Sequence, residues 1–123
     1  MVESEIPLLK GASKIIAASD LNDYKELIRI KTDPNRIIYI RDISIEIDDT
    51  TSLPQFKLSI NGTPYLKDFP LLTATKSLGF GGDLRGSDTK DPLIIWVKKT
   101  AAGTGALTVA CAVTGTQVPK TGK

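Results

Sequence analysis

Apolar and polar side chains alternate along most of this chain with the two-residue period of β-strands. The strongest run covers 37–47, where the odd positions hold Ile37, Tyr39, Arg41, Ile43, Ile45 and Ile47. This nearly apolar face is expected to point into a core. Ile38 and Ile40 make the first half apolar on both faces, so that half is expected to lie between layers or beneath a partner.

Four more runs read as strands. Residues 25–31 and 55–60 alternate, and Phe56, Leu58 and Ile60 share one face of the second run. Residues 93–97 are apolar on both faces, as expected of a central strand. The closing run, 107–118, places Leu107, Val109, Cys111 and Val113 on one face. The pattern predicts a long hairpin that pairs 93–99 with 106–114.

Turn signals separate these runs. Asp33-Pro34 begins a type I turn signal, and Asn61-Gly62 predicts a tight hairpin. Pro64 and Pro70 assign 64–72 to a sheet edge, because proline cannot donate to a central ladder. A short strand at 77–80 is expected to lead into a long flexible loop at 81–91, which has three glycines.

Six to eight strands and no convincing helix predict an all-β fold, a single antiparallel β-sandwich that is jelly-roll-like or immunoglobulin-like. The 14 Ile, 5 Val and 13 Thr among 123 residues agree with this fold class. We expect an extended N-terminal arm at 1–14, the sandwich domain at 15–118 and a flexible basic tail at 119–123. Ile6, Leu8 and Leu9 make the arm apolar enough to dock on its own domain or on a neighbour.

Composition removes most catalytic chemistry. The chain has no His and one Cys, so Ser-His-Asp and Cys-His mechanisms, an internal disulfide and a Cys-rich zinc site are all excluded. We predict no enzyme activity, no catalytic, cofactor-binding or metal-binding residue, and a buried, inert Cys111. The glycine-rich stretch 79–86 lacks the Lys-Ser/Thr ending of a phosphate-binding loop.

Charges are unevenly distributed. Residues 1–50 hold 7 basic and 10 acidic side chains, while residues 51–123 hold 9 and 4. Scatter explains this best, although a two-signed molecule could pack head to tail with copies of itself. The acids Asp42, Glu46, Asp48 and Asp49 are expected to form a solvated acidic face, with a subunit contact or a calcium site as alternatives.

Aromatic and apolar residues limit the remaining partners. Trp96 is expected in the core, and the three tyrosines are scattered, so no nucleic-acid surface is predicted. The longest apolar run, 93–97, is too short for a membrane span, and the first residues lack the features of a secretory signal.

The strand layout resembles that of small β-sandwich proteins on virus particles, especially head decoration or cement proteins of tailed phages. The resemblance covers Ile-Arg-Asp-Ile-Ser-Ile-Glu-Ile at 40–47, Phe-Lys-Leu-Ser-Ile-Asn-Gly at 56–62, the glycine-rich loop, Pro-Leu-Ile-Ile-Trp-Val-Lys at 92–98 and the closing strand from 105 to 115. It implies a non-enzymatic virion protein, made in the host cytoplasm and seated on a capsid surface. The implied partners are copies of itself, as a trimer or dimer, and a capsid or other virion protein.

Two alternatives stay open: a carbohydrate- or ligand-binding module of an adhesin or tail, and a small glycosidase that uses carboxylates alone. For the structural hypothesis, the predicted interface residues are Ile6, Leu8, Leu9, Ile38, Ile40, Leu84 and Arg85.

Overall fold

Eight β-strands and one short 3-10 helix make up the described chain. The computed structural model describes residues 6–31, 36–60, 62–86, 93–103 and 105–119, and only the backbone of Ile6 and of 80–86. The strands are β1 (Ile6–Ile16), β2 (Lys25–Ile30), β3 (Arg36–Ile47), β4 (Gln55–Ile60), β5 (Thr63–Pro70), β6 (Thr75–Gly86), β7 (Leu93–Lys98) and β8 (Leu107–Pro119). The helix η1 (Thr50–Ser52) joins β3 to β4.

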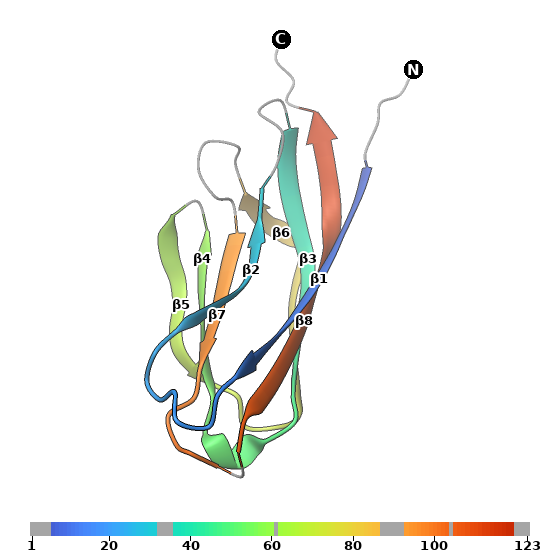
Figure 1. The fold of residues 1–123 in the computed structure, drawn as a ribbon. Coiled ribbons are helices and arrows are strands. Elements are labelled where there is room, and N and C mark those ends of the chain that lie inside the picture. Colours follow the sequence, from blue (N-terminus) through green and yellow to red (C-terminus); the bar gives the residue numbers. More distant parts are fainter. Residues whose placement is uncertain (1–5, 32–35, 61, 87–92, 104, 120–123) are drawn as a thin grey trace.

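The strands form two four-stranded antiparallel sheets that pack face to face (Figure 1). One has the order β1-β8-β3-β6 and the other the order β2-β7-β4-β5. Eight strands in the orders 1-8-3-6 and 2-7-4-5 form the jelly-roll arrangement, whereas an immunoglobulin sandwich places its first, second, fourth and fifth strands together in one sheet. The predicted all-β sandwich is confirmed, and the strand order decides between its two variants.

The core is a layer of aliphatic side chains between the sheets. Each inner face contributes alternate residues of its strands, and the central strands β3, β8, β4 and β7 contribute most of them. The most deeply buried members include Ile38, Ile40, Ile43, Ile45, Phe56, Leu58, Leu93, Ile95, Leu107, Val109 and Val113. Two faces of alternating apolar residues thus bury each other, as sheet packing requires.

A β-bulge divides β3, and it corrects the predicted inward face. The register of β3 shifts between Ile40 and Asp42 against both neighbouring strands, β6 and β8. The extra residue at Arg41 switches the inward row from even to odd positions, because a bulge changes the alternation by one. After the bulge, Ile43, Ile45 and Ile47 face inward as predicted. Before it, Ile38 and Ile40, both 0% exposed, face inward in place of the odd positions.

The predicted hairpin of 93–99 with 106–114 is wrong. β7 lies between β2 and β4, whereas β8 lies between β1 and β3 in the other sheet. The connection from 99 to 106 crosses from one sheet to the other instead of folding back. Both strands bury one face in the same core, so their alternation is the same whether they pair or oppose each other.

The described part of the predicted arm is an edge strand. Residues 6–16 form β1, which pairs with β8 from Ile6 opposite Gln117 to Ile16 opposite Leu107. Leu8 is 4% exposed and belongs to the core, while Leu9 faces solvent. The described part of the arm therefore pairs through its backbone with its own domain, and Leu8 packs into the core of that domain.

β6 extends through much of the predicted flexible loop. The strand runs to Gly86, and its backbone pairs Leu84 with Ile40 and Arg85 with Tyr39 of β3. The rest of that loop, 87–91, lies outside the described residues. The glycines of this segment predict a loop from the sequence alone. The segment is nevertheless a strand, because β3 is long enough to pair with it as far as Gly86.

The hairpin and edge predictions around β5 are confirmed. Ile60 pairs with Thr63, so β4 and β5 form a hairpin, and Gly62 before β5 has a φ of 82°. Asn61 lies outside the described residues. β5 is an edge strand, as its prolines require. The predicted tail at 119–123 lies outside the described residues except for Pro119, the last residue of β8.

Candidate functional site

A cation–aromatic cluster covers the outer face of the β2-β7-β4-β5 sheet. We use this name for Tyr24, Lys57, Asp68, Trp96 and Lys98. In β7 the side chains of Leu93, Ile95 and Val97 point into the core, so Trp96 and Lys98 between them point outward. Lys57 of β4 is directly opposite Trp96 in the ladder and shares that outer face.

Lys57 and Lys98 both lie against aromatic rings. The Lys57 Nζ is 4.2 Å from the Trp96 ring centroid and 4.7 Å from that of Tyr24, and the Lys98 Nζ is 4.6 Å from the Tyr24 centroid. Such distances allow attraction between an ammonium group and the negative face of a ring. The Tyr24 ring, which precedes β2 in the chain, therefore lies over the two central strands of this sheet.

Asp68 fixes the position of the Tyr24 hydroxyl. That hydroxyl donates to Asp68 Oδ1 at 2.5 Å and accepts from the Asp68 backbone N at 3.0 Å. Asp68 has a left-handed φ of 55°, which Asp tolerates better than most residues, where the β4–β5 register shifts. Because β2 and β5 are the two edges of the sheet, this contact ties one edge to the other.

The electrostatics of the cluster favour a protonated Tyr24. Burial, followed by the hydrogen bond to Asp68, raises the pKa of Tyr24 to about 12. The hydrogen bonds from Tyr24 and Lys98 lower the pKa of Asp68, and the Lys98 Nζ lies 3.1 Å from Asp68 Oδ1. Tyr24 is therefore a hydrogen-bond donor at neutral pH, and Lys98 is neutralised by Asp68.

Lys57 is the cation that this arrangement leaves unbalanced. It is half-buried between two rings, and no carboxylate of the described residues pairs with it. Ring faces compensate a partly desolvated ammonium less completely than a carboxylate does. The cluster can therefore accept an anionic group beside its two half-buried aromatic rings.

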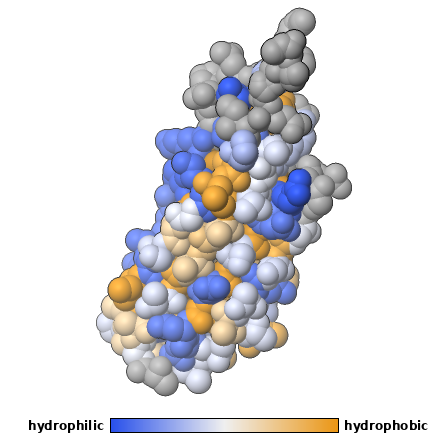
Figure 2. All heavy atoms as spheres, turned by 90° about the vertical axis from the view of Figure 1, so that its right-hand side faces the viewer, coloured by the Kyte–Doolittle hydropathy of each residue, from blue (hydrophilic) through white to orange (hydrophobic). Residues whose placement is uncertain are grey.

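The outer face of the other sheet carries the exposed Leu9 and Ile15 at its β1 edge and is smooth and acidic across β8 and β3. Rows of small side chains cross it, such as Gly11, Ala112, Ser44 and Ser77 on four adjacent strands. We call Asp42, Glu46 and Asp48 the acidic face; the first two are exposed and have no ion pair among the described residues. The exposed Arg41 stands beside them at the bulge. Figure 2 looks onto the side where β1 and β8 lie and shows hydrophobic and hydrophilic patches among residues of intermediate hydropathy.

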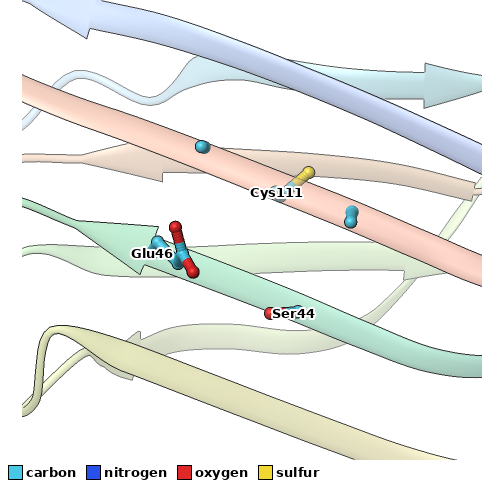
Figure 3. Close-up of a pocket in the computed structure, with 5 residues that line it drawn as sticks. Ser44, Glu46 and Cys111 are labelled. Carbon is cyan, nitrogen blue, oxygen red and sulfur yellow. The ribbon is translucent and has the colours of Figure 1, made fainter.

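A shallow depression lies in this smooth sheet. It is lined by Ser44 and Glu46 of β3 and by Ala110, Cys111 and Ala112 of β8 (Figure 3). The lining is shallow because the side chains are small, and Glu46 provides its only charge. Such a surface fits a protruding side chain better than a deeply enclosed ligand.

The remaining acids of the predicted cluster hold loops. The Asp48 carboxylate accepts from the backbone N of Thr108 at 2.9 Å. The buried Asp49 caps η1 by accepting from the backbone N and the hydroxyl of Thr51. Its role as a cap separates Asp49 from the acidic face, and no three metal-ligating side chains come together within the described ranges.

Cys111 is buried, as predicted from its inward position. Its side chain faces the core row of β8, and burial raises the pKa of its thiol to about 12. A thiol that does not ionise near neutral pH is a poor nucleophile.

An apolar hollow lies at the end of the sandwich that carries η1. Leu53, Pro54, Pro70 and Leu72 line it, and Leu53 and Leu72 are 59% and 76% exposed. Leu53 has a left-handed φ of 49° and is fixed there, because its carbonyl accepts from the Thr100 hydroxyl at 2.7 Å. Leu72 also borders a second hollow with Phe69 and Lys76. The hollow is thus a rigid apolar surface open to solvent.

Lys99 is an unexpected feature of the structure. Its side chain is 0% exposed, and its Nζ donates to the carbonyl oxygens of Ala18, Ala102 and Gly105 at 3.3, 3.0 and 2.6 Å. It thereby joins the connection before β2 to the connection before β8. Lysine usually indicates a surface position, so the sequence pattern gave no signal of this role.

The predicted interface residues do not form one surface. Leu8, Ile38 and Ile40 are core residues, so they are unavailable to a partner, and only Leu9 is exposed, at 73%. The side chains of Ile6, Leu84 and Arg85 lie outside the description. Trp96 is on the outer face rather than in the core, and Tyr24 joins it around Lys57, which corrects the expectation of scattered aromatics. The sequence held the signal for this position, because Leu93, Ile95 and Val97 form the inward row of β7 and alternation then places Trp96 on the outer face.

Comparisons with known proteins give similarity of strand layout only. No family model and no curated protein matches the chain. The chain is similar to the crystal structure of FLHE at 8% identity and a TM-score of 0.49, over 92% of this chain and 97% of that one. It is similar to a structure of Bacillus endospore appendages, a family of disulfide-linked pili, at 8% identity and 0.48, over 97% and 93%.

A third solved structure is matched over only part of its length. A family two carbohydrate esterase from Cellvibrio japonicus has 15% identity and a TM-score of 0.36, over 92% of this chain and 37% of that one. None of these similarities carries an argument about function. Among the described residues, no helix is long and apolar enough to cross a membrane.

Proposed function

We propose that this chain is a non-enzymatic structural protein of a virus particle, a decoration or cement protein that binds a capsid shell and stabilises it. The apolar hollow is the observation that carries the proposal. Exposed apolar surface on a rigid support is typical of protein–protein contact sites. The jelly roll is common in capsid proteins, although a fold alone does not assign a function.

The construction of the hollow supports a contact role. Left-handed φ at a residue other than glycine costs about 1–3 kcal/mol, and such strain clusters at functional positions. In this chain the strain turns Leu53 toward solvent instead of into the core. An apolar side chain from a shell protein would bury Leu53 and Leu72 together.

The first test locates the protein. Virus particles released by cells that carry this gene would be purified on a density gradient and analysed by mass spectrometry and immunogold electron microscopy. We expect the chain to co-purify with particles and the gold to label the outside of the shell. Particles without the chain would overturn the proposal.

The second test addresses the hollow. Purified Leu72→Asp is expected to bind particles stripped of this protein at least about tenfold more weakly than the wild type, because a carboxylate would be buried without a partner. Thr63→Asp, an exposed position outside the hollow, is the matched control and should bind normally. Equal binding of the wild type and Leu72→Asp would contradict the role of the hollow.

A ligand-binding module is the second candidate, and the cation–aromatic cluster favours it. Trp96 is the only tryptophan of the chain, so its fluorescence reports on this cluster alone. Titration with uronic-acid oligosaccharides is expected to change that fluorescence in the wild type and not in Lys57→Gln, if this function is correct. An unchanged signal would reject acidic sugars as ligands.

A further inference from the structure

The two outer faces of the sandwich are complementary in charge. The cation–aromatic cluster holds the half-buried Lys57 without a carboxylate partner among the described residues, and the Tyr24 ring lies over the central strands beside it. On the opposite side of the molecule, Asp42 and Glu46 are exposed carboxylates on a smooth sheet. One face therefore has a cation without a carboxylate among the described residues, and the other has carboxylates without a cation paired to them among those residues.

The acidic face is also open to a partner. The depression lined by Ser44, Glu46 and Ala112 is open and shallow, and Figure 3 shows Glu46 and Ser44 side by side on β3. Small side chains let a neighbouring surface approach the backbone closely, so Glu46 can reach a cation on that surface. Within the same molecule the two faces point in opposite directions and cannot meet (Figure 1).

We propose that a second copy of this chain docks its acidic face onto the cation–aromatic cluster, so that Glu46 of one copy pairs with Lys57 of the next. The inference deepens the proposed function and rests on it, because both make this chain an assembly protein. Different patches meet in this contact, so it is heterologous, and repetition gives a ring or an open stack.

Charges near the contact favour this occupant. Lys98 is already neutralised by Asp68, and Arg29 pairs with Glu26 at 2.6 Å, whereas Lys57 has no carboxylate partner among the described residues. The acidic face has the exposed Arg41 as its described basic neighbour and keeps a net negative charge with Asp42, Glu46 and Asp48. Attraction between the faces should therefore weaken as salt screens it.

The test is a charge swap measured by sedimentation velocity over a concentration series. We expect the wild type to self-associate in 50 mM NaCl and at least about tenfold more weakly in 500 mM NaCl. Lys57→Glu and Glu46→Lys should each remain monomeric, because each places like charges in the contact. Mixed in equal amounts, the two variants should associate again, since each supplies the charge that the other has lost.

Controls keep the result interpretable. Lys10→Glu makes the same change of charge on β1, outside both faces, and should associate like the wild type. Circular dichroism and urea midpoints verify that each variant folds, and Lys57→Gln serves as the second test if Lys57→Glu does not. A wild type that stays monomeric, or variants that associate normally, would overturn the inference.

The two proposals fail separately. Immunogold labelling of particles tests the virion role whatever the result of sedimentation. Labelled particles together with a monomeric wild type would leave the virion role standing and remove the self-association.

Discussion

At the scale of single residues, polar groups in unusual places hold this sandwich together. Lys99 is the clearest case, because a fully buried ammonium satisfies three backbone carbonyls from two connections. Hydrogen bonds from a charged donor are stronger than neutral ones, and removal of such a donor leaves its acceptors desolvated.

We predict that Lys99→Met lowers the free energy of unfolding by about 3 kcal/mol, because three buried carbonyls lose their donor. Lys10→Met, an exposed lysine of β1, is the matched control and should change it by less than about 0.5 kcal/mol. Urea unfolding followed by Trp96 fluorescence measures both. Equal stability of the two variants would show that water replaces the ammonium.

Tyr24 predicts a loss of stability at alkaline pH. Its pKa is about 12 in the folded protein against 10.0 ordinarily, so above pH 10 the unfolded chain gives up a proton that the folded protein keeps. The free energy of unfolding therefore falls as the pH rises from 10 to 12. Cys111 acts in the same direction from 9.0 to about 12.

Comparison of the wild type with Tyr24→Phe isolates the tyrosine. Both proteins keep Cys111, so the difference between their pH profiles belongs to Tyr24. We expect a less steep loss of stability in Tyr24→Phe above pH 10, together with the loss of the ionisation step near pH 12 in the absorbance at 295 nm. Identical slopes would contradict the burial of the hydroxyl.

At the scale of the elements, bulges decide which residues reach the core. β3 buries even positions before Arg41 and odd positions after it, and the chain opposite makes room for the bulge. Gly115 of β8 pairs with Ile40 there, and a Cβ on Gly115 would overlap the carbonyl oxygen of Tyr39. The absence of a side chain is therefore required at this position.

We predict that Gly115→Ala costs about 3 kcal/mol of stability, because the added methyl must displace the backbone of β3. Gly79→Ala is the matched control, since Gly79 faces the same bulge from β6 and its Cβ would lie 3.5 Å from Asp42 Oδ1, an ordinary contact. Thermal unfolding by circular dichroism compares the two. A similar melting temperature for both variants would show that the bulge adapts.

At the scale of the whole molecule, the edge strand β1 is protected from pairing with strands of other molecules. β1 is a long edge strand, and its core-side row reads Leu8, Lys10, Ala12, Lys14 and Ile16. The two lysines are exposed on the inward row, which is a device that prevents edge strands from pairing with other chains. Because the β1 edge is protected from strand pairing, association with other molecules is expected at the outer faces of the sheets and at the apolar hollow.

We predict that Lys10→Val with Lys14→Val converts β1 into a self-pairing edge. The fold should persist, but light scattering and thioflavin fluorescence should rise with protein concentration. Lys10→Ser with Lys14→Ser is the control for loss of charge without gain of β-propensity, and it should aggregate less. A fully soluble valine variant would show that another feature protects the edge.

The sequence by itself determined the fold class, because alternation, proline positions and the Asn61-Gly62 turn are local signals with local causes. It indicated most of the core for the same reason, and composition alone limited the available chemistry. The tertiary structure decided which strands are neighbours, since β7 and β8 have the same pattern whether they pair or face each other. It also decided the candidate sites: Tyr24, Lys57 and Trp96 meet only because three strands become adjacent, and Lys99 is buried only because two connections close over it. Such long-range contacts depend on strand order, which no local pattern records.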